Sequence, residues 1–94
     1  MPAYWMTRVR VTDAEGYGKY AALAGPAIEK HGGRFLARGG ATITLEGEDY
    51  PRNVIVEFPT VEAAEACYHS PEYQEAVSHA KDSAERLMCI VEGV

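Results

Sequence analysis

Five aromatic side chains are placed so that they can meet in one region of the folded chain: Trp5, Tyr17, Tyr20, Tyr68 and Tyr73. Tyrosine offers a flat apolar body and one hydroxyl, which suits the binding of small aromatic or quinone-like compounds. Plain core packing would explain the same residues equally well, so both interpretations stay open. If a pocket forms, we expect these five residues to line it, between a sheet and its helices.

The three histidines are the candidate groups for proton transfer or ligand contact. We expect His31 or His79 near the mouth of the pocket. For His31 the simpler interpretation is that it caps the end of a helix, where an imidazolium interacts favourably with the negative end of the helix dipole. His69 and His79 lack the i, i+4 partner of a metal site. We therefore expect no metal and no cofactor, with haem ligation by a histidine as a minor alternative.

Arg8 and Glu57 are the candidate charged pair of the predicted sheet. Both fall in the middle of strands that we expect to be neighbours, and on the same face. They could form an acid or oxyanion site. They could also form an ion pair that sets the register of a dimer interface, which is costly unless the pair is well hydrogen-bonded. The interface ion pair is the simpler interpretation.

The composition restricts the class of partner. Nine basic residues against fourteen acidic ones give a net charge of −5, which disfavours nucleic acid as a partner. No apolar run approaches the roughly 20 residues that span a bilayer, and the N-terminus does not resemble a secretory signal. Cys67 and Cys89 lack C-x-x-C spacing, so we expect buried, reduced thiols and a cytoplasmic protein.

The hydrophobic pattern predicts strands that alternate with helical segments. Strands are expected over 3–11, 34–38, 53–58 and 86–92, with a further extended stretch over 41–45. Gly39-Gly40 is expected to form a bulge or a tight turn between 34–38 and 41–45.

Local signals predict where the helices begin and end. Thr12-Asp13-Ala14-Glu15 resembles a capping box, and Gly25-Pro26 is expected to kink the helix that follows. Gly32-Gly33 should end that helix with a positive φ. A second helix is expected from Thr60 to His69, and it restarts after Ser70 with proline at its first position.

This order of elements, β-α-β-β-α-β, predicts an α+β fold. Right-handed crossovers give a four-stranded antiparallel sheet with both helical segments on one face, which is the ferredoxin-like arrangement. We expect residues 1–94 to form a single domain.

Strand alternation assigns two faces to the sheet. The helix-facing set is expected to be Trp5, Val9, Val11, Phe35, Val54, Val56, Phe58, Leu87, Cys89 and Val91. The opposite face should carry Tyr4, Met6, Arg8, Leu36, Ile55, Glu57, Met88 and Ile90. This second face is too apolar to be left in water, so we expect two sheets to pack face to face in a homodimer.

Several short motifs resemble a known family when they are taken together. They are Tyr20, His31-Gly32-Gly33-Arg34-Phe35-Leu36, Arg38-Gly39-Gly40, Leu45-Glu46-Gly47, Glu57-Phe58-Pro59, Ser70-Pro71-Glu72-Tyr73-Gln74 and Val91-Glu92-Gly93. In order and spacing these motifs resemble the domain-of-unknown-function family 1330 over nearly the whole chain. The resemblance implies a dimeric α+β barrel, a superfamily that includes cofactor-free monooxygenases, small isomerases and haem-dependent enzymes. His79-Ala80-Lys81 departs from the pattern, where relatives tend to carry an arginine, and the family supplies no catalytic residues to carry over.

Three functions are compatible with these features. The first is a small cofactor-independent enzyme, monooxygenase-like or isomerase-like, acting on a small aromatic or organic-acid compound. The second is a non-catalytic module that binds a small organic ligand, and the third is a purely structural dimer. No nucleophile–base pair is visible in the sequence, so the residues alone do not choose among them.

Overall fold

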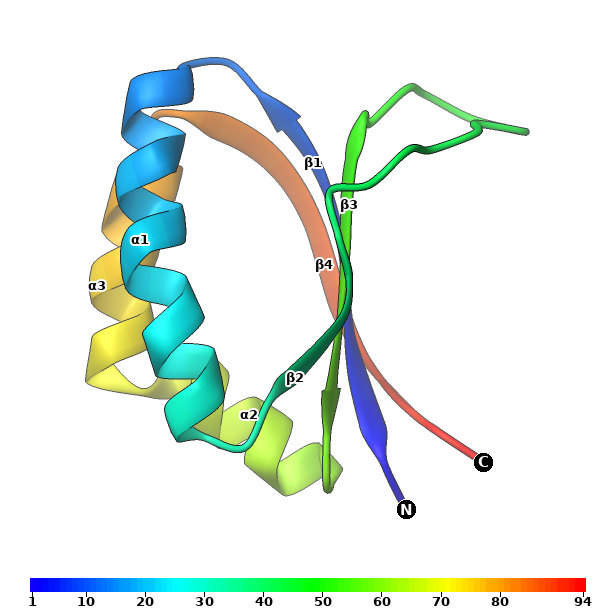
Figure 1. Ribbon diagram of the computed structural model, residues 1–94, viewed down its shortest axis with the longest axis vertical. Helices are drawn as coiled ribbons and strands as arrows, with labels where there is room; N and C mark the ends of the chain where they lie inside the picture. The colour runs from blue at the N-terminus through cyan, green and yellow to red at the C-terminus, as the bar shows by residue number, and fades with distance from the viewer.

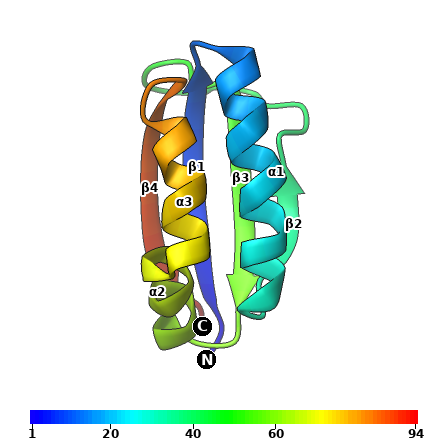
Figure 2. The same ribbon diagram turned by 90° about the vertical axis from the view of Figure 1, so that its left-hand side faces the viewer.

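Four antiparallel strands form one sheet, and three helices cover a single face of it (Figure 1 and Figure 2). A computed structural model describes residues 1–94. The elements are β1 (Ala3–Val11), α1 (Ala14–Lys30), β2 (Arg34–Arg38), β3 (Arg52–Phe58), α2 (Val61–His69), α3 (Pro71–Ala80) and β4 (Ala84–Glu92). The strand order is β2-β3-β1-β4, which confirms the predicted ferredoxin-like α+β fold.

Helix α1 begins one residue later than the capping box predicted. Asp13 is the N-cap, and its side chain accepts a hydrogen bond from the Glu15 amide at 3.2 Å. Thr12 instead donates its backbone N–H to the Ser83 carbonyl at 2.8 Å. Asp13 also donates its backbone N–H to this carbonyl, at 3.0 Å, so the start of α1 is tied to the segment before β4.

Pro26 does not interrupt α1, which continues to Lys30. The proline is on the exposed side of the helix, where water can hydrate the carbonyl group that it leaves unpaired. The helix ends at His31, and Gly32 follows with φ = 84°, as the glycine pair predicted. The two shorter helices are capped as expected, by Thr60 and Ser70.

Residues 41–45, expected as a further extended stretch, do not form a strand of the sheet. Strand β3 pairs with β1 on one side and with β2 on the other, so β3 offers this segment no free edge. The bulge is in β2 itself, between Phe35 and Ala37, rather than at Gly39-Gly40. Gly39 has φ = 72° and turns the chain out of the sheet.

The two faces of β4 are the reverse of the prediction. Met88 and Ile90 pack against the core on the helix side, whereas Leu87 and Cys89 are exposed on the other face. The pairing with β1 sets this orientation, because Ile90 is opposite the buried Trp5. Both sets of β4 side chains are apolar, so alternation alone could not distinguish them.

The face without helices, here called the open face, is partly apolar. Met6 is 45% exposed there and Leu87 is 51% exposed. Cys89 is a free thiol on this face, which corrects the expectation that both cysteines are buried, whereas Cys67 is buried and free. None of the helices has the length and apolar character that crossing a bilayer requires.

Candidate functional site

The aromatic residues singled out in the sequence do come together between the sheet and the helices. The Tyr73 ring centroid is 4.9 Å from that of Trp5, 5.6 Å from that of Tyr68 and 6.0 Å from that of Tyr20. Tyr17 extends the cluster, with its ring 5.2 Å from Tyr20. Tyr73 is therefore the centre of the group, and it is fully buried.

These five residues do not line one common pocket. Trp5, Tyr17 and Tyr20 line a cavity of about 30 Å³ under α1, which has room for about one water molecule. Tyr68 lines a separate open groove of about 400 Å³ between α2 and β4. The buried Tyr73 ring packs against both Trp5 and Tyr68. Helix α1 continues unbroken through Gly25, which lines the small cavity.

Neither of the two expected histidines lines the cavity. His31 is the C-cap of α1, and its Nδ1 is 3.0 Å from the Ala27 carbonyl oxygen. His79 is in the last turn of α3. His31 therefore caps the end of the helix, which is the structural role considered for it from the sequence. No group of three or more His, Cys, Asp or Glu side chains is arranged to hold a metal ion.

Arg8 and Glu57 share the open face but do not pair with each other. The register places Arg8 opposite Asn53, and the Arg8 Nε donates a hydrogen bond to Asn53 Oδ1 at 3.1 Å. Glu57 forms an ion pair with Arg34 of β2 at 2.7 Å. Arg8 and Glu57 therefore do not form the predicted pair within the protomer. The residue opposite Arg8 on β3 is Asn53, which is four residues away from Glu57.

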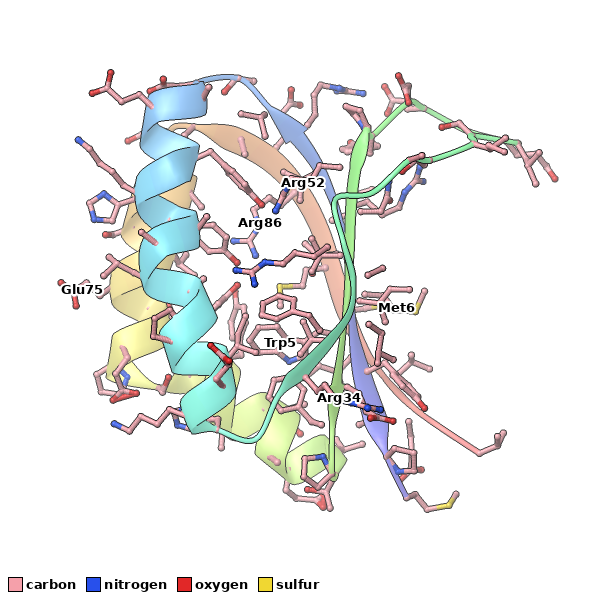
Figure 3. All side chains as sticks on the ribbon, viewed as in Figure 1. Trp5, Met6, Arg34, Arg52, Glu75 and Arg86 are labelled. Carbon is pink, nitrogen blue, oxygen red and sulfur yellow. The ribbon has the colours of Figure 1, made fainter.

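Two other arginines, which the sequence analysis did not single out, reach into the layer between sheet and helices. Arg52 and Arg86 extend from the sheet toward the helices, above Trp5 in the view of Figure 3. The guanidinium carbon of Arg52 is 5.5 Å from the Tyr17 ring centroid, and that of Arg86 is 4.7 Å from the Tyr20 centroid. Two neighbouring tyrosine rings, tilted by 39° to each other, thus each lie beside one of these cations.

A third arginine, Arg38, closes the cavity from the end of β2. Its guanidinium carbon is 4.0 Å from the Phe35 ring centroid, and both residues line the cavity together with Arg52. None of the arginines in this cluster (Arg38, Arg52 and Arg86) makes an ion pair, because the ion pairs of the chain use Arg10, Lys30 and Arg34. The cavity lining contains no carboxylate, imidazole or thiol.

Arg86 is held by two phenol groups. Its Nη2 donates hydrogen bonds to Tyr73 Oη at 2.8 Å and to Tyr20 Oη at 3.2 Å, and the two phenol oxygens are 2.7 Å apart. One phenol donates to the other, so one of the two O–H groups has no acceptor. The Nε atoms of Arg52 and Arg86 are also buried without a partner. The cluster has more donors than acceptors.

Burial determines the protonation state of these groups. It raises the pKa of Tyr20 and of Tyr73, and the neighbouring Tyr73 raises that of Tyr20 further. Both phenols are therefore neutral donors near pH 7. Burial, together with the nearby Glu72, also raises the pKa of the Cys67 thiol to about 12, so this thiol is not an activated nucleophile.

The Arg38-Gly39-Gly40 motif positions two of the arginines. A Cβ atom on Gly39 would collide with the guanidinium group of Arg52, and the positive φ of Gly39 independently disfavours any side chain. Across the cavity, a Cβ on Gly25 would be 3.1 Å from Arg38 Nη2. Glycine at these positions lets the guanidinium groups approach the backbone closely. In the sequence, the glycine pair directly after Arg38 is the feature that could have indicated this close approach.

A family model described as "Domain of unknown function (DUF1330)" matches residues 2–94. The chain belongs to the DUF1330 family. Among curated proteins none matches the chain. RPA0582 from Rhodopseudomonas palustris, described as a protein of unknown function, has a similar structure: its TM-score is 0.83 at 25% identity, over 99% of this chain and 82% of that one.

Two more distant structures share the fold of this DUF1330 protein. One is a dimeric ferredoxin-like protein of unknown function from Jannaschia sp. CCS1, with a TM-score of 0.68 at 16% identity over 99% of this chain and all of that one. The other is SnoaB from Streptomyces nogalater, a cofactor-independent oxygenase, with a TM-score of 0.68 at 12% identity, covering 99% and 93%. At these identities the likeness concerns the fold alone.

Proposed function

We propose that this DUF1330 protein binds a small organic anion with a flat apolar body in the layer between its sheet and its helices. The observation that carries the proposal is the arginine cluster, in which Arg38, Arg52 and Arg86 have no acidic partner. Arg52 and Arg86 are half-buried with their Nε atoms buried and unpartnered, whereas Arg38 is exposed at the cavity mouth. Withdrawing a charge from water without a partner is costly. A bound anion would supply the missing partner and accept the unused N–H and O–H donors.

The lining favours a carboxylate joined to an aromatic or similar flat group. Guanidinium groups recognise carboxylates through paired hydrogen bonds. The rings of Tyr17, Phe35 and Trp5 offer flat apolar surface beside them. The cavity of about 30 Å³ is smaller than such a ligand, so binding requires the Arg38 side chain to swing away from Phe35.

Binding is better supported than catalysis. The site supplies positive charge and neutral donors, and its lining has no carboxylate, imidazole, thiol or amine to act as a general base. Burial raises the pKa of Tyr20, which keeps this phenol protonated. An isomerase-like or oxygenase-like reaction without a cofactor is the second candidate, and the oxygenase SnoaB shares the fold. In that case the arginines would stabilise an anionic form of the substrate, and the base would have to come from elsewhere.

We further propose that two copies associate through their open faces. Met6 and Leu87 expose apolar surface there, and burying such surface contributes about 25 cal/mol per Å². The protein from Jannaschia sp. CCS1, which shares the fold, is described as dimeric. Met88, which we expected at this interface, is excluded from it because the residue packs on the helix side of β4.

Titration calorimetry with benzoate and salicylate as probes, and with benzamide as the neutral counterpart of benzoate, tests the anion proposal. We expect a carboxylate probe to bind the wild-type protein and benzamide to bind at least about tenfold more weakly. The Arg52→Met variant keeps an unbranched apolar stem but loses the charged guanidinium group, and its affinity for the carboxylate should fall by about tenfold or more.

Lys81→Met is the matched control, because it removes one positive charge from an exposed position outside the cavity. This variant should bind the carboxylate as the wild-type protein does. Three results would each overturn the proposal: neither carboxylate binds, benzamide binds as well as benzoate, or Arg52→Met retains full affinity.

A further inference from the structure

The loop between β2 and β3 contains a short segment that behaves like a strand without a partner. Residues 41–49 are here called the arm. They make no backbone–backbone hydrogen bond, although 41–45 alternate polar and apolar residues as a strand does. In Figure 1 the arm leaves the end of the sheet and projects on the side opposite the helices.

The two threonines and Asp49 of the arm make hydrogen bonds within the protomer. Thr42 Oγ1 accepts a hydrogen bond from Asn53 Nδ2 at 3.2 Å, and Thr44 Oγ1 donates one to Asp49 Oδ1 at 3.2 Å. Arg10 donates to the Asp49 carbonyl oxygen at 3.1 Å, which ties the arm to β1. The arm is therefore held in place and presents its other face outward.

That outward face is apolar. Ile43 is 86% exposed and Leu45 is 88% exposed, far more than Met6 or Leu87 on the open face. Each of these side chains would gain roughly 1.5–3 kcal/mol of transfer free energy from full burial. Two such residues beside an unpaired stretch of backbone have the features of a surface for pairing with another chain.

We infer that the arm docks on a second copy of this chain and forms part of the dimer interface, an inference that rests on the proposed association of the open faces. The arm projects beyond the open face, so a second sheet packed on that face must lie beside it. Its apolar residues then continue the contact that Met6 and Leu87 begin. The main-chain groups of 41–45 would pair with backbone or side-chain groups of the partner.

The arm enlarges the surface that a second copy could cover. Stable dimers usually bury about 800 Å² on each partner. Ile43 and Leu45 add exposed apolar surface to that of Met6 and Leu87 on the open face.

Sedimentation analysis of the double variant Ile43→Ser, Leu45→Ser tests the inference. We expect its dimer dissociation constant to rise at least about tenfold above that of the wild-type protein. Leu23→Ser is the control, because Leu23 is 37% exposed on α1, away from the open face, and the same kind of substitution there should leave dimerisation unchanged.

Amide hydrogen exchange gives an independent readout of the same arm. The amides of residues 42–45 should exchange at least about tenfold more slowly in the dimer than in an unstructured peptide. They should lose this protection in Leu87→Asp, a variant designed to separate the dimer. A wild-type protein that is monomeric would overturn the proposed dimer and with it this inference. If the wild-type protein is a dimer but the double variant dimerises equally well, the arm does not form part of the interface. The same conclusion holds if the amides of the arm are not protected in the dimer.

Discussion

Arg86 carries its charge inside the layer between sheet and helices, where its nearest polar partners are two phenols and a thioether. Its Nη2 is 2.8 Å from Tyr73 Oη and 3.4 Å from Met88 Sδ. Phenol oxygens only partly replace the water that a guanidinium loses on burial. The charge is therefore tolerated in the free protein by the hydroxyl network and is available to an anion.

Removing one hydroxyl of this network should destabilise the protein. In Tyr73→Phe the ring remains, but Arg86 and Tyr20 lose a hydrogen-bond partner. The free energy of unfolding should fall by about 1–3 kcal/mol, the usual cost of leaving a buried polar group unsatisfied. Tyr68→Phe is the matched control, because the Tyr68 hydroxyl makes no hydrogen bond in the chain, and its effect should stay within about 0.5 kcal/mol.

Urea unfolding of the two variants measures this difference. Equal stability of Tyr73→Phe and Tyr68→Phe would show that the Arg86 network contributes nothing to the fold.

At the scale of the elements, two glycines near α1 should respond to the same substitution with opposite signs. Gly32 ends the helix with φ = 84°, so Gly32→Ala should lower the free energy of unfolding by about 1 kcal/mol. Gly18 is inside α1 with open space around it, so Gly18→Ala should raise that free energy by about 0.5–1 kcal/mol. Thermal and urea unfolding test both changes. A loss of stability in Gly18→Ala, or none in Gly32→Ala, would contradict this description of the helix.

The elements themselves were predictable because each carries a local signal. Gly32-Gly33 ends α1, Thr60 and Ser70 begin α2 and α3, and these signals depend only on neighbouring residues. The orientation of β4 was not predictable, since Leu87 and Met88 are equally apolar and the register with β1 decides which faces the helices.

The candidate site was only partly predictable for a similar reason. The aromatic residues were predicted to come together because aromatic side chains commonly line ligand sites, and they do converge around Tyr73. Arg52 and Arg86 have no such signal, because arginine on a strand is normally expected in solvent. Their placement follows from strand register and from the space that Gly39 leaves, both of which are tertiary features.

At the scale of the whole molecule, stability should decline at alkaline pH in part through Cys67. Burial raises the pKa of this thiol from 9.0 to about 12 in the folded chain. The protonated thiol is thus favoured by folding, and its contribution to stability is full below pH 9 and lost as the pH rises toward 12. The difference in unfolding free energy between the wild-type protein and Cys67→Ala should shrink over that range. A difference that does not change with pH would contradict the assignment.

The proposed dimer predicts a contrast between two positions on β4. Leu87→Asp places a carboxylate on the open face and should separate the dimer, because burying an unpaired charge is costly. Met88→Asp points toward the helices and should instead destabilise each protomer. Light scattering together with urea unfolding separates the two effects. A dimeric Leu87→Asp protein would contradict the proposed interface.

Binding of an organic anion beside the arginine cluster can be followed directly through Trp5. Trp5 is the one tryptophan of the chain, it is buried, and it lines the cavity with Arg38 and Arg52. Titration of benzoate or salicylate should change the tryptophan fluorescence of the wild-type and Lys81→Met proteins in a saturable way. It should change that of Arg52→Met only at concentrations about tenfold higher or more. If calorimetry shows saturable binding of the carboxylate while the Trp5 fluorescence does not change, the ligand binds elsewhere and the proposed site is wrong.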